Sequence, residues 1–303
     1  MSTSHFDLNT LRIFIIAADS GSLTKAAASS SITLSAASKR IAELERNLNC
    51  QLFIRHARGM ELTAAGQGLL RHARSLLESV NSMASELKDY AQGAIGHVRI
   101  AANVSAVIQF LPEDLAAFFQ HSPGIRIHLE EALSEEVIES VDSGRVDIGI
   151  FADNVDATSL KTYPWRQDRL VLLVPIGHPL AKHHEITFTD TLSWDYVALN
   201  QGSSLLRRIT DAALAAGHIL KVNIQVTSFD AVCRMIQAGL GIGILPIGAI
   251  TPALLGTSLK AVDILDDWGK RTLRLGVNAK KPLQPEAEKL LQFLMSVPDC
   301  NIR

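Results

Sequence analysis

From residue 97 onward, the chain alternates between short apolar runs typical of strands and amphipathic runs typical of helices. The alternation begins with HVRIAA at 97–102 and PEDLAAFFQHSP at 112–123, and it ends with PEAEKLLQFLMSV at 285–297. Strands that alternate with helices build βαβ units around a parallel sheet. We therefore expect an α/β fold over about two thirds of the chain.

The stretch 32–48 near the N-terminus predicts a helix with two distinct faces. Apolar residues at Ala37, Ile41, Leu44 and Leu48 are spaced 4, 3 and 4, which gives one buried stripe. The opposite side is small, hydroxylated and basic, a character that suits the major groove of DNA. Its residues are Ser35, Ser38, Lys39, Ala42 and Arg46. Taken alone, the pattern also fits an ordinary amphipathic helix with a solvated face.

The segments on either side of this helix favour DNA binding. Before it, Ser22 or Thr24 is placed to cap a short alanine-rich helix, and Thr33 is placed to cap the next one. A short helix, a tight turn and a longer helix with a basic face form a helix-turn-helix. After it, residues 51–66 contain two short strand-like runs around Arg58, which predict a wing whose Arg55 and Arg58 reach phosphates.

The order and spacing of these motifs extend over about sixty residues. They comprise Leu11, Phe14, Gly21-Ser22-Leu23-Thr24-Lys25-Ala26-Ala27, Ser38-Lys39-Arg40-Ile41, Leu44-Glu45, Leu48, Gln51-Leu52-Phe53, Arg55, Leu62-Thr63 and Gly66. The pattern resembles the winged helix of LysR-type transcriptional regulators. Where that family usually has Gln and then Pro, this chain has Leu34 and Ser35, so its base preference is expected to differ. The expected DNA-binding residues are Thr24, Thr33, Leu34, Ser35, Ser38, Lys39, Arg55 and Arg58.

A long helical pattern follows the predicted wing. Its apolar residues repeat at spacings of 4 and 3 over three heptads, which is typical of a coiled-coil seam between two chains. The expected dimerisation residues are Leu69, Ala73, Leu76, Val80, Met83 and Leu87, with Tyr90 completing the seam. The alternative is a helix that packs on its own domain. The family resemblance favours a linker helix that pairs two subunits, and it implies a tetramer of two such dimers.

The second part of the chain also resembles this family. The matching motifs are Gly96-x-Val98-Arg99-Ile100-Ala101, Gly144-x-x-Asp147-Ile148-Gly149-Ile150, His178-Pro179-Leu180-Ala181 and Ala238–Pro246. The resemblance implies an effector domain similar to periplasmic binding proteins, with two α/β lobes joined by crossover strands. We therefore expect a winged helix at 1–66, a linker helix at 67–91 and an effector domain at 92–303. Lobe I would span 92–163 and 267–303, and lobe II would span 164–266.

Three turns in the expected effector domain combine a strand end, a polar side chain and a helix start. Ligands of two-lobed α/β domains bind at such places, where helix N-termini present N–H groups that suit an anion. No Lys or Arg falls in these turns, so neutral donors would hold a small carboxylate effector. The expected effector-binding residues are Asn103, Ser105, Phe151, Trp165, Ser203, Thr227 and Phe229. Singly, each Ser or Thr is equally explained as a helix cap.

Composition excludes several other classes of protein. The net charge is −2, but residues 24–74 hold eight basic and three acidic residues, a local patch suited to phosphates. The three cysteines lie far apart without a CxxC motif, which argues against a disulfide framework. They also do not lie where some members of the family that the chain resembles carry a redox-sensing pair. No membrane-spanning run and no signal-peptide pattern is present, so a cytoplasmic location is expected.

Signals for catalysis are weak. Ser22-Leu23-Thr24-Lys25 fits S-x-x-K without the accompanying motifs, and the glycines at 239–243 do not form G-x-G-x-x-G. No metal-ligand spacing and no cofactor motif is found, so neither is expected. The sequence thus predicts a ligand-responsive, sequence-specific DNA-binding regulator that forms homo-oligomers and is not an enzyme. The alternative is a small-molecule binding protein or an enzyme whose helical N-terminal extension does not bind DNA.

Overall fold

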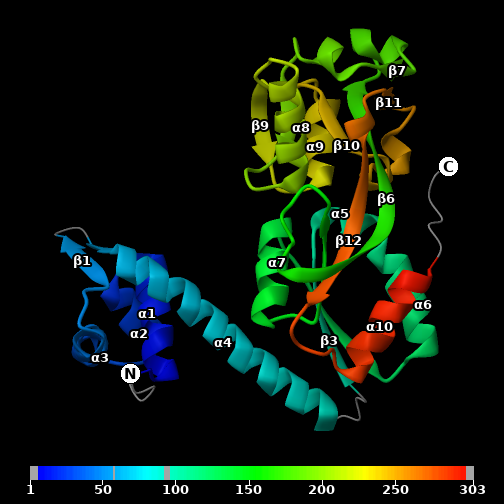
Figure 1. Cartoon of the computed structure of the whole chain (residues 1–303). Helices are drawn as coiled ribbons and strands as arrows, with labels where there is room; N and C mark the ends of the chain where they lie inside the picture. Colours follow the sequence, from blue (N-terminus) through cyan, green and yellow to red (C-terminus); the bar gives the residue numbers. More distant parts are fainter. Residues whose placement is uncertain (1–5, 57–58, 92–95, 298–303) are drawn as a thin grey trace. The chain divides into compact units, whose positions relative to one another are not determined.

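The computed structural model describes residues 6–56, 59–91 and 96–297, and the chain divides into two compact units, Met1–Gln92 and Gly93–Arg303 (Figure 1). Each unit has a hydrophobic core of its own. The elements of unit 1 are α1 (Leu8–Ser20), α2 (Leu23–Ser29), α3 (Leu34–Leu48), β1 (Phe53–His56), β2 (Gly59–Leu62) and α4 (Ala64–Ala91). The predicted helix-turn-helix, wing and long helix are all present.

Unit 1 is held together by small and aromatic side chains. Ala26 and Ala27 of α2 are buried, so the neighbouring helices approach α2 closely. The rings of Phe14 and Phe53 lie 5.2 Å apart and join α1 to the wing. Strands β1 and β2 pair antiparallel, as the wing prediction requires.

Unit 2 contains the alternating strands and helices. They are β3 (Gly96–Ala102), α5 (Val104–Gln109), α6 (Leu111–His121), β4 (Ile125–Glu131), α7 (Ser134–Ser143), β5 (Ile148–Ala152), β6 (Leu160–Pro175), β7 (Glu185–Ile186), β8 (Tyr196–Leu199), α8 (Ser204–Ala215), β9 (Val222–Val226), α9 (Phe229–Gln237), β10 (Gly243–Pro246), β11 (Leu259–Ile264), β12 (Lys270–Asn278) and α10 (Pro285–Ser296). The α/β fold class predicted from the alternation is confirmed.

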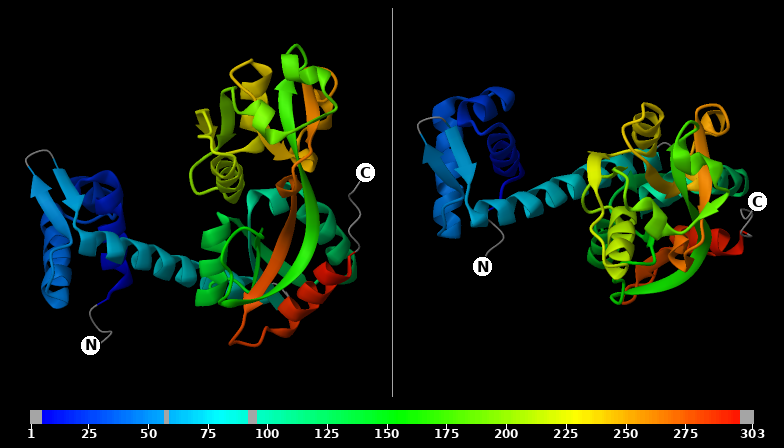
Figure 2. Two further views of the ribbon diagram at one scale, coloured as in Figure 1. Left: turned by 45° about the horizontal axis from the view of Figure 1, so that its top comes forward. Right: turned by 90° about the horizontal axis from the view of Figure 1, so that it is seen from above.

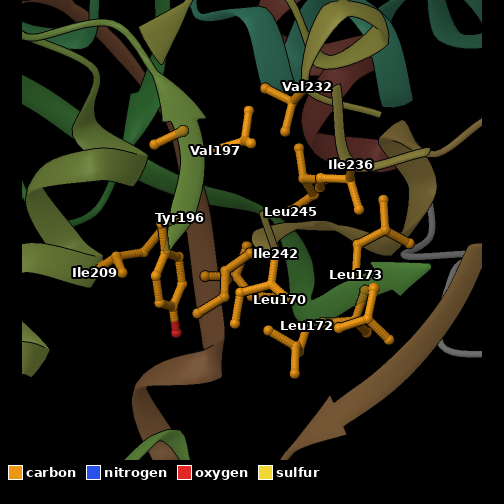
Figure 3. Packing of buried hydrophobic residues seen from close by; sticks show 14 of the residues in the cluster. Leu170, Leu172, Leu173, Tyr196, Val197, Ile209, Val232, Ile236, Ile242 and Leu245 are labelled. Atoms are coloured by element: carbon orange, nitrogen blue, oxygen red, sulfur yellow. The ribbon is translucent and has the colours of Figure 1, made fainter. Parts of the chain in front are cut away.

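Two lobes make up unit 2. Lobe I is built on β4, β3 and β5, which run parallel, with α7 on one face of the sheet and α6 and α10 on the other (Figure 1). Lobe II has a separate core formed by β6, β8, α8, α9 and β10. Figure 3 shows this core, where Leu170, Leu172 and Leu173 of β6 gather with Tyr196, Ile236 and Ile242.

Strands β6 and β12 connect the lobes. The first part of β6 pairs with β12 in lobe I, and residues 170–175 pair with β10 and β11 in lobe II. Both strands run side by side in every view of Figure 2. The sequence predicted only 168–175 as the strand, and β12 is antiparallel to β5 rather than parallel. The sheet is therefore mixed, because these two strands serve both lobes.

Candidate functional site

The N-terminal end of α3 presents polar groups to solvent. Thr33 caps the helix by accepting a hydrogen bond from the amide of Ala36 at 3.2 Å, and its Oγ1 lies 3.0 Å from the Ser35 hydroxyl. Ser35 and Lys39 are exposed and Ser38 is half-buried. The side chains of Ala37, Ile41 and Leu44 are buried on the opposite side. The two faces of the helix are therefore as the sequence predicted.

The turn before α3 determines the orientation of this helix relative to α2. Ser22 caps α2 by accepting from the amide of Lys25 at 3.4 Å, which selects Ser22 over Thr24 as the cap. Thr24 lies exposed in the first turn of α2. Ser31 has a positive φ of 54°, and the amide of Ile32 donates to the carbonyl of Ala27 at 3.0 Å. This turn ends α2 and redirects the chain so that α3 can begin after Thr33.

The wing is fixed to α3 by a carboxylate that the sequence analysis did not single out. Glu45 accepts hydrogen bonds from the amides of Leu52 and Phe53 at 2.8 and 3.2 Å. In the sequence, the only indication that Glu45 holds the wing is its position at the border of the buried stripe of α3. The side chain of Arg55 and the whole of Arg58 lie outside the described residues, so their predicted DNA contacts stay predictions.

The predicted seam on α4 divides into two parts. Ala73 is 1% exposed in the core of unit 1, and Leu69 packs against the same core. This corrects the expectation for Ala73, which its own winged helix covers, while the half-buried Leu69 is covered only in part. Farther along, Leu76, Met83 and Leu87 are 44%, 56% and 62% exposed, and Val80 is half-buried. These four residues form the exposed stripe of α4.

A cavity of about 330 Å³ lies between the two lobes of unit 2. Strand ends and helix starts border it, so side chains from both lobes meet there. Its lining includes four predicted residues, Asn103, Ser105, Ser203 and Thr227. Asn103 caps α5 by accepting from the amide of Ala106 at 3.0 Å, and Ser203 caps α8.

Three predicted aromatic residues do not line this cavity. Phe151 is fully buried in lobe I, because every residue of β5 is covered on both faces of the sheet. Trp165 packs edge-on against Phe110 at 5.7 Å. Phe229 is 1% exposed in the core of lobe II. The expectation that Phe151, Trp165 and Phe229 bind an effector in this cavity is therefore corrected.

A buried ion pair lies behind the cavity wall. Arg271 of β12 donates to Asp168 of β6 at 2.9 and 2.5 Å, and it also donates to the hydroxyl of Ser105 at 2.7 Å. Gln109 donates to the same carboxylate at 3.2 Å. Since Ser105 accepts from Arg271, its own hydroxyl hydrogen is left for another acceptor. No sequence signal indicated this pair, whose members are 103 residues apart.

Polar side chains join the lobes beside the cavity. Asn103 donates to the hydroxyl of Ser134, which donates to the hydroxyl of Ser204, both at 3.3 Å. Arg208 of α8 binds Asp153 of lobe I, and burial lowers the pKa of Arg208 while this carboxylate acts in the opposite direction. A second pair joins the same two lobes, since Arg207 of α8 lies 2.6 Å from Glu135 of α7.

A glycine lies where the two lobes approach each other closely. Gly202 has a φ of +89°, and a Cβ at this position would lie 2.8 Å from a methyl group of Leu133 in the other lobe. Any larger residue would be strained by the positive φ and would require the Leu133 side chain to move. The lobes in this structure are therefore in contact at the edge of the cavity.

The charged side chains that line the cavity are acidic. Glu131 and Glu136 belong to the lining, and the residues described there include no Lys or Arg. Glu136 accepts from the amide of Leu133 at 3.0 Å and so occupies the N-terminus of α7. The N-terminus of α8 carries no such carboxylate in its first turn. An anion is thus better accommodated beside α8 than beside α7.

Other kinds of site find little support in the described part of the chain. There, no group of three or more His, Cys, Asp or Glu side chains is arranged to hold a metal, and no helix is long and apolar enough to span a membrane. Burial raises the pKa of the Cys233 thiol to about 11, so it is not a reactive thiolate at neutral pH. Cys300 lies outside the described residues.

Comparison with known proteins identifies both units. Residues 8–67 match the model "Bacterial regulatory helix-turn-helix protein, lysR family", and residues 91–298 match the "LysR substrate binding domain". A "Probable RuBisCO transcriptional regulator" of Trichormus variabilis is 28% identical, over 99% of this chain and 92% of that protein.

Solved structures show the same fold. Full-length CbnR complexed with its target DNA has a TM-score of 0.74 at 20% identity, covering 96% of this chain and 99% of that one. The regulatory domain of CcmR from Synechocystis PCC6803, in complex with 2-PG, has a TM-score of 0.61 at 24% identity. That match covers 66% of this chain and 96% of the other.

Proposed function

Because the chain belongs to the LysR family of bacterial transcriptional regulators, we propose that it reads its operator with α3 and responds to a small anion bound between its lobes. The observation that carries the DNA-binding part is the exposed hydroxyl and basic side of α3 within a matched winged helix. The alternative of a helical extension that does not bind DNA finds no support in this geometry.

For DNA binding, we assign separate roles to the exposed residues of unit 1. Ser35 and Ser38 face base edges, while Thr24, Thr33 and Lys39 bind phosphates or adjacent bases. Lys39 is 77% exposed and lies 4.0 Å from Glu43, a pair too weak to hold it away from DNA. Arg55 and Arg58 of the wing add phosphate contacts.

Replacement of Lys39 tests this assignment. Lys39→Ala should weaken operator binding and reduce the slope of log affinity against log salt by about one, because one phosphate contact is lost. Fluorescence anisotropy over a salt series measures both quantities. Lys260→Ala in unit 2 is the matched control and should behave as the parent. An unchanged salt slope for Lys39→Ala would remove this residue from the interface.

For the effector, the cavity favours a monocarboxylate that also carries hydroxyl or amino groups. Ser105, Ser203 and the N-terminus of α8 supply donors for the carboxylate. Glu131 and Glu136 would accept from the hydroxyl or amino groups and would repel a second negative charge. A volume of about 330 Å³ suits a metabolite of this small size.

Two serine variants test the effector site. After a thermal-shift screen of full-length protein with lactate, glycerate, benzoate and related acids, calorimetry should show Ser105→Ala and Ser203→Ala binding the hit about ten- to hundredfold more weakly. Each loses one hydrogen bond to a charged group. Ser143→Ala, whose hydroxyl bonds Ser140 outside the cavity, should bind as the parent does. A hit that is cationic or purely apolar would contradict the proposal, as would parental affinity in both variants.

For assembly, we propose that two chains pair through the exposed stripe of α4 and that two such dimers associate. Apolar side chains repeated at heptad spacing are stable in water only when a partner covers them. Because unit 1 covers Ala73 fully and Leu69 in part, the exposed part of the pairing surface begins near Leu76.

A further inference from the structure

Leu34 is an apolar side chain at the end of α3 that our proposed function places in the major groove. It is the first residue of the helix, directly after the cap Thr33, and it is 48% exposed. Recognition helices contact base edges through their N-terminal residues. A single exposed leucine needs no explanation on most protein surfaces. At the first residue of a recognition helix, however, its side chain would meet the edges of the bases.

The polar groups beside Leu34 are partly engaged within the helix. The hydroxyls of Thr33 and Ser35 lie 3.0 Å apart, and Thr33 also accepts from the amide of Ala36. Leu34 itself has no donor or acceptor in its side chain. The first turn of α3 therefore offers DNA the apolar side chain of Leu34 between two hydroxyls, whose mutual hydrogen bond uses one hydroxyl hydrogen and leaves the other for DNA.

Only one base presents an apolar group in the major groove. Thymine carries a methyl group at C5, whereas the other bases present donors and acceptors there. A Leu side chain against a donor or acceptor would leave that group without a hydrogen bond, which is costly. We infer that Leu34 covers the 5-methyl group of a thymine in each half-site and so selects T·A at that position. The inference rests on the proposed role of α3 as the reading helix.

The test uses full-length protein and DNA that lacks single methyl groups. A site is first obtained by in vitro selection, and each thymine in it is then replaced by deoxyuridine. Removal of one methyl group should weaken binding about fourfold at one thymine in each half-site, and removal of the symmetric pair should weaken it about fifteenfold. At all other thymines the affinity should stay within twofold.

Variants connect this effect to Leu34. Leu34→Ala should bind thymine and deoxyuridine sites equally, and Leu34→Gln should shift selection at that position toward adenine, which a carboxamide pairs with twice. Leu8→Ala removes another exposed leucine of unit 1 and should keep the parental fourfold difference. Melting curves check that each variant is folded, and Leu34 is exposed enough that no large loss is expected.

The outcomes separate this inference from the function on which it rests. Sequence-specific binding in which deoxyuridine is tolerated everywhere, or in which Leu34→Ala still discriminates, would overturn the methyl contact alone. Failure to select any site would overturn the proposed DNA reading by α3 as well. The inference would be established if Leu34→Ala lost the difference in affinity between thymine and deoxyuridine sites while Leu8→Ala kept it.

Discussion

Two lysines in the exposed stripe of α4 should abolish the proposed pairing of two chains through this helix and so reduce the size of the oligomer. Leu76→Lys with Met83→Lys places four charges in one dry interface, where unpaired charges are very unfavourable. Both positions are exposed in the single chain, so folding of unit 1 should be unaffected. Operator affinity should fall at least a hundredfold, because a dimer reads two half-sites together. Sedimentation velocity and anisotropy titrations measure these two effects.

A charge-matched variant controls for the added lysines. Gln67 and Asn81 are exposed on the other side of α4, and Gln67→Lys with Asn81→Lys adds the same charge away from the stripe. This variant should keep the parental oligomeric state and should bind DNA at least as well as the parent. An oligomer of unchanged size in Leu76→Lys/Met83→Lys at micromolar concentration would show that the stripe is not the interface.

Loss of Asp168 should destabilise unit 2 strongly. Its carboxylate is the partner of Arg271, and the two side chains are only 2% and 1% exposed. Asp168→Ala leaves a buried cation unpaired, which costs about 3–5 kcal/mol. For a unit of this size the melting temperature should fall by roughly 10 °C. The three tryptophans, Trp165, Trp194 and Trp268, all lie in unit 2, so their fluorescence follows its unfolding in the full chain.

The neighbouring exposed ion pair provides the control. Arg169 binds Asp263 at 2.8 Å, and both side chains are close to half exposed. Exposed pairs contribute about 0–1 kcal/mol, so Asp263→Ala should lower the melting temperature by only about 2 °C. Equal effects of the two replacements would mean that the Asp168–Arg271 pair contributes no more than a surface contact.

The sequence predicted the elements better than their connections. Periodicity located α3 and the helices α6 to α10 of unit 2, because each has one apolar face that repeats every 3.6 residues, but it did not locate the short α5. It did not reveal that β6 continues for 16 residues through both lobes. A strand covered on both faces shows no alternation, and the change of partners from β12 to β10 is set by residues far away in sequence.

The candidate site was predicted in part, and the limits have a physical reason. Small polar residues at strand ends, such as Ser105 and Ser203, were correctly placed beside the cavity because helix caps mark these turns. Aromatic residues at similar positions were misplaced, since Phe151 and Phe229 enter the lobe cores instead. Arg271 was missed because a buried arginine is recognisable only with its distant carboxylate in view.

The place of β12 in the sheet has a consequence for synthesis of the protein. This strand lies between β5 and β6, yet it is translated after every element of lobe II. On the ribosome, lobe II can therefore complete its core while lobe I still lacks both its central strand and α10. Nascent domains usually fold in order from the N-terminus, and here the earlier lobe has to wait for the last thirty or so residues. Until then, the apolar surface of β3 and β5 that β12 and α10 cover in the finished fold stays open to water, which makes the nascent lobe prone to aggregation.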